Sequence, residues 1–155
     1  MQGNPEVIER LNALLVGELT AIDQYFIHSR IYQDMGLDKL FTQISHEMAE
    51  EQGHADLLIK RILFLEGKPD LSKRDPLLVG HDVPEMLRND LTYEYKVIPH
   101  LREVMAFCES VQDFETRDIL LKLLKDTEED HTWWLEKQLR LIDTIGLQNY
   151  IQSQI

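Results

Sequence analysis

The motif Glu-x-x-His occurs twice in the sequence, at residues 51–54 and 128–131. On a helix, side chains three positions apart project from the same face, so each copy can offer a carboxylate and an imidazole to one metal ion. A further glutamate precedes each copy at almost the same distance, Glu18 by 33 residues and Glu94 by 34. The repeat indicates two similar halves that contribute ligands of the same kind to a metal centre.

Residues that begin and end helices divide the chain into four long segments. Asn4 followed by Pro5 is typical of a helix start, and Gly36 and Gly67 are typical of helix ends. Candidate N-caps precede the other three segments: Asp38, Asp82 and Asp113. We expect helices over residues 5–35, 38–66, 82–110 and 113–146, and a short amphipathic helix over 147–155.

Residues 68–81 contain two Pro and one Gly and have no sustained apolar period. They predict a connection long enough to cross the length of a bundle, whereas the other connections are short turns. The expected fold class is all-α, an antiparallel four-helix bundle with one long crossover and a short C-terminal fifth helix, in a single domain over residues 1–155. Pro99 lies inside the third helix and predicts a kink between about Tyr95 and Pro99.

Apolar residues recur every three or four positions along each predicted helix and mark the side that packs in the core. One glutamate interrupts each stripe near its middle: Glu18, Glu51, Glu94 and Glu128. Burying four unpaired carboxylates would be strongly unfavourable, but two divalent cations would neutralise their charge. Carboxylate oxygens with one imidazole for each metal suit iron or manganese better than zinc.

The composition excludes several classes of function. Lys and Arg number 16 against 28 Asp and Glu, which gives a formal net charge of −12. A chain this acidic, with no basic cluster, is a poor ligand for nucleic acid or an anionic membrane. The single cysteine, Cys108, excludes an internal disulfide and a Cys-based zinc site. With no membrane-spanning apolar run and no signal-peptide pattern, we expect a cytoplasmic protein.

Five stretches resemble a known family: LNALLVGELTAIDQYFIHSR, HADLLIKRILFLEGKPDL, VPEMLRNDL, EEDHTWWLE and GLQNYIQSQI. With the repeated Glu-x-x-His motif, they make the chain similar to bacterioferritin over essentially its whole length. The resemblance implies a ferritin-like fold and a hollow shell of 24 subunits that stores iron. Each subunit would act as a ferroxidase, oxidising ferrous iron with O₂ or H₂O₂ at a di-iron centre and passing ferric mineral to the cavity.

The resemblance also implies the ligands of that centre. Six residues match the family's ligand types: Glu18, Glu51, His54, Glu94, Glu128 and His131. Of these, Glu51 and Glu128 would bridge the two irons. The remaining four would be terminal ligands, in the pairs Glu18 with His54 and Glu94 with His131.

Further positions match the family outside the ligand set. Tyr25, two turns after Glu18, matches a tyrosine that can donate an electron to the centre. His46 and Glu50 fall near the family's iron site on the cavity side. Asn149 and Gln152 match polar residues near the pores between subunits. The apolar side of the C-terminal helix would pack against symmetry mates around a fourfold axis: Leu147, Tyr150, Ile151 and Ile155.

Gln52 departs from the family pattern. Haem-binding members have a methionine at this position, and one methionine from each of two subunits binds the haem iron. A glutamine amide cannot replace a thioether as a ligand of haem iron. We therefore expect neither haem b nor the usual ferredoxin-mediated iron release in a shell of this chain alone. The chain would be a haem-free ferroxidase or share a mixed shell with a haem-binding subunit.

Two other functions remain open from the sequence. A small rubrerythrin-like peroxidase uses a similar di-iron bundle and stores no iron, but it normally adds a Cys-rich electron-transfer domain, which one cysteine cannot provide. A purely structural subunit of a mixed shell would not need carboxylates in its core.

Overall fold

The computed structural model describes residues 1–155 and contains helices and no strands. The helices, in chain order, are α1 (Pro5–Asp34), α2 (Asp38–Phe64), α3 (Val83–Ser110), α4 (Phe114–Asp126), the π-helical turn η1 (Thr127–Thr132), α5 (Trp133–Ile145) and α6 (Leu147–Ser153). None of them combines the length and the apolarity needed to cross a lipid bilayer.

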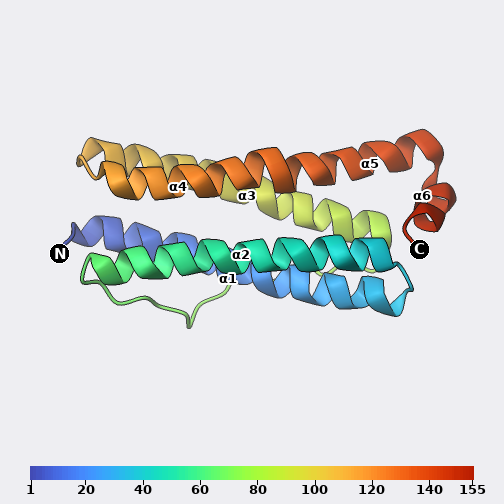
Figure 1. Cartoon of the computed structure of the whole chain (residues 1–155), viewed down its shortest axis with the longest axis horizontal. Coiled ribbons are helices and arrows are strands. Elements are labelled where there is room, and N and C mark those ends of the chain that lie inside the picture. Colours follow the sequence, from blue (N-terminus) through green and yellow to red (C-terminus); the bar gives the residue numbers. More distant parts are fainter.

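Two antiparallel hairpins make up the bundle (Figure 1). One pairs α1 with α2, and the other pairs α3 with the continuous rod formed by α4, η1 and α5. The connection from α2 to α3 runs from one end of the bundle to the other, so α2 and α3 point in the same direction (Figure 1). The expected all-α, ferritin-like four-helix bundle with one long crossover is confirmed.

Side-chain caps start three of the long helices where the sequence predicts them. Asn4, Asp82 and Asp113 each accept a hydrogen bond from a backbone N–H in the first turn, at 2.8–3.0 Å. The prediction that Asp38 caps α2 is wrong, because Asp38 is already the first helical residue and Leu37 at the N-cap offers no side-chain acceptor. Asp38 instead places a negative charge in the first turn, which favours the helix through its dipole.

Buried apolar side chains form two clusters. One contains Leu11, Leu58 and Leu120, and the other contains Tyr32 and Leu40, with further residues from all the long helices. Fully burying one such side chain contributes about 1.5–3 kcal/mol. The two apolar clusters hold the helices together on either side of the buried polar residues described below.

A buried polar network attaches the crossover to the bundle. The backbone N–H of Gly80 donates to Nε2 of His28 at 3.1 Å, and Nδ1 of His28 lies 2.8 Å from Oδ1 of Asp90. Gln24 donates to the same Asp90 oxygen at 2.8 Å and accepts from the N–H of Leu78 at 3.1 Å. Since Nε2 accepts, the proton of the neutral ring is on Nδ1, where it is donated to Asp90. The network therefore joins α1, α3 and the crossover.

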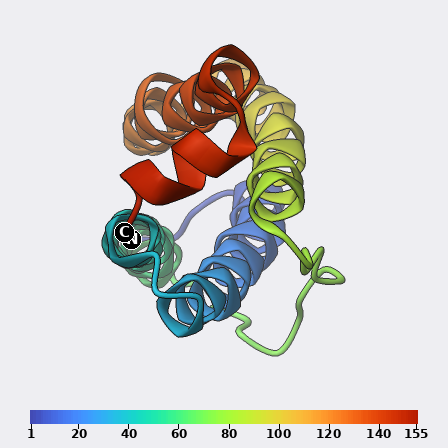
Figure 2. The same ribbon diagram turned by 90° about the vertical axis from the view of Figure 1, so that its right-hand side faces the viewer.

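The C-terminal helix α6 lies across one end of the bundle (Figure 2). Tyr150 is fully buried, and its hydroxyl donates to Oε1 of Gln138 at 2.9 Å. The expectation that Tyr150 packs against symmetry mates is therefore wrong, because this side chain is enclosed by its own chain. The backbone N–H of Lys39 donates to the carbonyl of Gln154, which ties α6 to the start of α2.

Two irregular places lie within the long helices. Pro99 lies inside α3, and the helix continues past it to Ser110, as the sequence predicts. The π turn η1 divides the fourth long helix between Asp126 and Trp133, and the sequence pattern gave no sign of it. A π turn holds one more residue than an α turn, so it changes which side chains face the core.

Replacing Gly80 by alanine should weaken the attachment of the crossover. The new Cβ would lie 2.6 Å from the backbone nitrogen of Met86, so the chain must move. We expect Gly80→Ala to lower the free energy of unfolding by about 1–3 kcal/mol, measured by chemical denaturation.

Gly53→Ala is the matched control, because a Cβ at Gly53 meets nothing within 4 Å and the residue lies inside α2. It should raise the free energy of unfolding by about 0.5–1 kcal/mol. Equal effects of the two substitutions would contradict the packing argument.

Candidate metal centre

Five ionisable side chains from four elements meet in the middle of the bundle, and each is at most 2% exposed. They come from α1, α2, α3 and η1: Glu18, Glu51, His54, Glu94 and His131. Helical spacing brings Glu51 and His54 to one face of α2, as the Glu-x-x-His motif predicts. The long helices thus bring together residues that are more than a hundred positions apart.

Glu51 lies between the two histidines and turns one carboxylate oxygen to each. Its Oε2 is 3.3 Å from Nδ1 of His54, and its Oε1 is 2.8 Å from Nδ1 of His131. Glu18 approaches the first histidine at 3.6 Å, and Glu94 approaches the second at 3.5 Å. The result is two groups of three potential ligands that share Glu51, each with its ligand atoms within 4.8 Å of one another.

The geometry at His131 fits metal binding better than hydrogen bonding. Its buried Nδ1 atom has no hydrogen-bond partner although two carboxylate oxygens lie nearby. Nδ1 of a neutral imidazole is a metal ligand when the other nitrogen carries the proton. For His54, Nε2 lies 2.9 Å from Oδ2 of Asp126, which can accept that proton and leave Nδ1 free.

Burial and mutual repulsion change the protonation of these groups. Burial, together with the charge of Glu51, raises the pKa of Glu18, and burial also raises the pKa of Glu94. Although burial opposes it, a hydrogen bond from Glu18 and the nearby imidazoles of His131 and His54 hold the pKa of Glu51 below its ordinary value. Burial lowers the pKa of His54, but hydrogen bonds with Glu18 and Glu51 raise it to about 11. Without metal, the histidines thus supply the positive charge.

Glu128 is not in this group, and its predicted place in the core is wrong. Its side chain is 37% exposed and forms an ion pair with Arg102 of α3 at 2.5 Å. The preceding residue, Thr127, is buried instead. The π turn explains the difference, because its extra residue shifts Glu128 out of the phase that a continuous α-helix would give it.

Tyr25 is buried beside the centre. Its hydroxyl donates a hydrogen bond to Oε1 of Glu94, and its ring lies edge-on to that of His131, with centroids 6.3 Å apart. Burial, followed by the charge of Glu94, raises the pKa of Tyr25 well above its ordinary value. The tyrosine is therefore neutral, and its hydroxyl holds one carboxylate of the centre in place.

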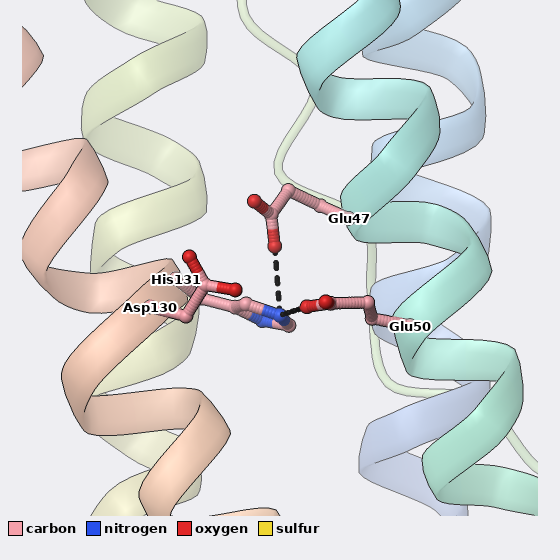
Figure 3. A group of neighbouring side chains, drawn as sticks. All are labelled: Glu47, Glu50, Asp130 and His131. Atoms are coloured by element: carbon pink, nitrogen blue, oxygen red, sulfur yellow. Dashed lines mark hydrogen bonds and ion pairs between the residues drawn. The ribbon is translucent and has the colours of Figure 1, made fainter.

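A second group of acids adjoins His131 on its other side (Figure 3). Glu47 and Glu50 of α2 point toward Nε2 of His131, and Asp130 of η1 lies beside them. Burial and the charges of Glu47 and Glu50 raise the pKa of Asp130. Glu47 is 1% exposed and is not among the site residues predicted from the sequence. Its burial could have been predicted from spacing. Ile44, Glu47 and Glu51 follow one another along α2 in the three- and four-residue steps that are typical of the buried side of a helix.

The other predicted site residues lie nearer the surface. His46 is 58% exposed and forms an ion pair with Glu50, Nε2 to Oε1, at 3.1 Å. Gln52 is exposed on α2. Asn149 and Gln152 are exposed on α6, where the side chain of Asn149 donates a hydrogen bond to the backbone carbonyl of Ile145 at 2.7 Å.

Comparison with known proteins identifies the family. The ferritin-like domain of the ferritin family matches residues 8–145. The chain belongs to the ferritin family. It is 64% identical over 155 residues to the bacterial ferritin of Synechocystis sp., covering all of this chain and 99% of that protein.

Two further relatives in the family cover the whole bundle. The bacterial ferritin of Pseudomonas aeruginosa is 56% identical over 155 residues and covers all of both chains. The bacterioferritin of Rhodobacter capsulatus is 45% identical over 150 residues, which are 97% of this ferritin chain and 92% of that protein. The match therefore extends beyond the buried centre to the crossover and the C-terminal helix.

Removing one buried acid should stabilise the metal-free protein. In Glu18→Gln, a neutral side chain of the same shape replaces a carboxyl group that is buried next to Glu51. We expect the free energy of unfolding to rise by about 1–3 kcal/mol, measured by denaturation after treatment with a chelator. Glu9→Gln, on the exposed side of α1, removes the same charge and should have almost no effect. A loss of stability in Glu18→Gln would contradict the electrostatic argument.

Proposed function

We propose that this protein oxidises ferrous iron at the buried centre and stores the ferric product. The observation that carries the proposal is the position of Glu51, which offers one oxygen to each of two carboxylate–histidine groups. Two ions held in this way would neutralise the enclosed charge. Oxygen ligands with one imidazole for each ion suit iron. Names of the relatives, bacterial ferritin and bacterioferritin, support the same conclusion.

Each ligand has a distinct role in the proposed reaction. Glu18 and His54 hold one ferrous ion and Glu94 and His131 hold the other, while Glu51 bridges them. Each iron gives one electron to the oxidant, so two irons reduce O₂ with two protons to H₂O₂, or H₂O₂ with two protons to water. The bundle fixes the distance between the ions and excludes bulk water.

Glu128 is proposed as the sixth ligand, and it must first leave Arg102. An exposed ion pair of this kind contributes only about 0.2–1 kcal/mol. A divalent ion at the centre, which attracts the carboxylate with twice the charge, can therefore displace the arginine. Tyr25, in contact with Glu94, is an oxidisable side chain that can supply a further electron to the centre.

The storage function requires an assembly. We infer a shell of 24 copies of this single di-iron domain, as the similarity to bacterioferritin implies, with the mineral in its cavity. The net charge of −12 for each chain attracts ferrous ions to the shell. His46 and Glu50 are proposed to receive iron at the inner surface. Asn149 and Gln152 are proposed to line pores between subunits.

A mixed shell is the second candidate, and Gln52 favours it. This side chain is exposed on α2, where a partner subunit can approach it. Its amide does not suit haem iron, which takes thioether, thiolate or imidazole ligands. A second subunit with a methionine at this position would bring haem, while this chain brings the di-iron centre. In either assembly, the chain itself is a ferroxidase and not only a structural subunit.

Ferrous iron titration under anaerobic conditions, followed by oxygen, tests the centre. The wild-type protein should bind two ferrous ions per chain and oxidise them rapidly. We expect Glu51→Ala and His131→Ala to reduce the rate more than about 100-fold, because even partners of metal ligands contribute about 10- to 100-fold. Glu9→Gln is the control. Unchanged oxidation in both site variants would exclude this centre as the place of reaction.

Haem content tests the interpretation of Gln52. The assembled wild-type protein should bind no haem b when reconstituted, as judged by its absorption spectrum. Gln52→Met restores the thioether and should allow one haem for each pair of subunits. Gln52→Leu has a similar size and no metal ligand, so it should remain haem-free. Normal haem binding by the wild-type protein would show that Gln52 does not prevent haem binding.

A further inference from the structure

The last part of the crossover is held to the bundle by one nitrogen of a buried histidine. The backbone N–H of Gly80 donates to Nε2 of His28 at 3.1 Å, and the His28 side chain is completely buried. Gly80 is also buried, and the start of α3 encloses it on its other side, where a Cβ would lie 2.6 Å from the nitrogen of Met86. While the crossover is docked, water therefore cannot replace His28 as the acceptor.

The bond to Gly80 exists only while the ring of His28 is neutral. Nδ1 carries the ring proton and donates it to Oδ1 of Asp90 at 2.8 Å, which leaves the lone pair of Nε2 for the backbone N–H. A second proton would enter at Nε2 and point at that N–H group. Two buried donors would then face each other with no acceptor between them, which is strongly unfavourable.

The opposite edge of the ring favours the same proton. Asp90 is 1% exposed, and it forms the only ion pair of His28. Burial raises the pKa of Asp90, and a full positive charge on His28 would favour its ionised form. Protonation of His28 would thus strengthen the contact of α1 with α3 and break the contact of α1 with the crossover.

The other titratable groups around His28 do not compete for this proton. Tyr25 and Tyr32 lie one turn before and one turn after it on α1, and Tyr150 of α6 lies near Tyr32. Burial raises the pKa of all three tyrosines, so they stay neutral. His81, in the crossover, is 90% exposed and takes up its proton in water. No side chain of α2 forms an ion pair with His28.

We propose that acid releases the last part of the crossover, residues 77–81, from the bundle, and that protonation of His28 at Nε2 is the releasing event. In the released form, the N–H of Gly80 and the new Nε2–H of His28 both bond to water, while Nδ1–H stays on Asp90. This form holds one proton more than the docked form, so a lower pH favours it. Imidazoles ordinarily change charge between about pH 5 and 8.

The first part of the crossover is held by a group that does not titrate in this range. The backbone N–H of Asp75 donates to the hydroxyl of Thr20 at 2.8 Å. Leu78, by contrast, donates to Gln24, which is itself bonded to Asp90 in the same network as His28. Acid should therefore free the segment around Leu78 and leave the attachment of Asp75 in place.

Hydrogen–deuterium exchange of the assembled protein, followed by mass spectrometry at about pH 7.5 and about pH 5.5, tests the release. Rates are first divided by those of unfolded peptides at the same pH. The protection of residues 77–81 should fall by about 10- to 100-fold at the lower pH, because one linked proton changes an equilibrium at most tenfold per pH unit. The protection of Asp75 should stay almost the same, which provides a control within the wild-type protein.

His28→Gln separates the histidine from other effects of acid. The glutamine carbonyl can accept from Gly80 and its amide can donate to Asp90, and neither group titrates. We expect the protection of residues 77–81 in this variant to be the same at both pH values. The matched control is His81→Gln, at the exposed histidine of the same segment, which should show the same fall as the wild-type protein.

Two results would overturn the inference. If residues 77–81 of the wild-type protein keep their protection at the lower pH, or lose it equally with Asp75, acid does not release this segment selectively. This comparison needs no variant. If His28→Gln folds and still shows the fall, the responsible proton binds elsewhere, with Asp90 the first alternative. Neither result bears on the buried metal centre, which the ferrous iron titration tests separately.

Discussion

Carboxylates enclosed in the middle of the bundle need positive charge close to them, and this requirement explains much of the surrounding structure. Glu18, Glu51 and Glu94 are almost completely buried. In the metal-free chain, His54 and His131 lie between them and compensate part of their negative charge. Apolar clusters on either side keep water out, which strengthens every charge interaction at the centre. Cations at the centre would lower the electrostatic free energy of these buried carboxylates, so the packing itself favours metal binding.

The sequence predicted most of the fold because its signals are local. Caps such as Asn4 and Asp82 and single glycines such as Gly36 and Gly146 mark where helices start and stop, and the 3.6-residue period identifies the buried face. Five site residues followed from that period together with the Glu-x-x-His repeat. The exposed position of Glu128 was not predicted, because one extra residue in the π turn changes the phase of the helix. No pattern of residue types indicates such a turn.

Buried polar residues outside the repeat were also missed, for a different reason. His28 and Asp90 are residue types that usually lie on the surface. They are stable in the core only because they bond to each other and, through His28, to Gly80 of the crossover. Glu47 was missed because Met48, beside it, is the more obvious choice for an apolar stripe. The burial of His28 and Asp90 depends on elements that are distant in sequence, so periodicity within one helix cannot reveal it. For Glu47, periodicity allowed two neighbouring positions, and only the partners on η1 decide between them.

The buried attachment of the crossover has a consequence for the order of folding. Each hairpin joins neighbouring segments through a short turn, so its contacts are local and can form early. The parallel arrangement of α2 and α3 requires the chain to travel the length of the bundle first. The acceptors of Gly80 and Leu78 lie on α1 and are themselves bonded to Asp90 of α3, so this network is complete only when the two hairpins pack together. Docking of this segment is therefore a late event. Chains that have not completed it would expose the face of α1 and α3 that the crossover covers, with Gln24, His28 and Asp90 open to water.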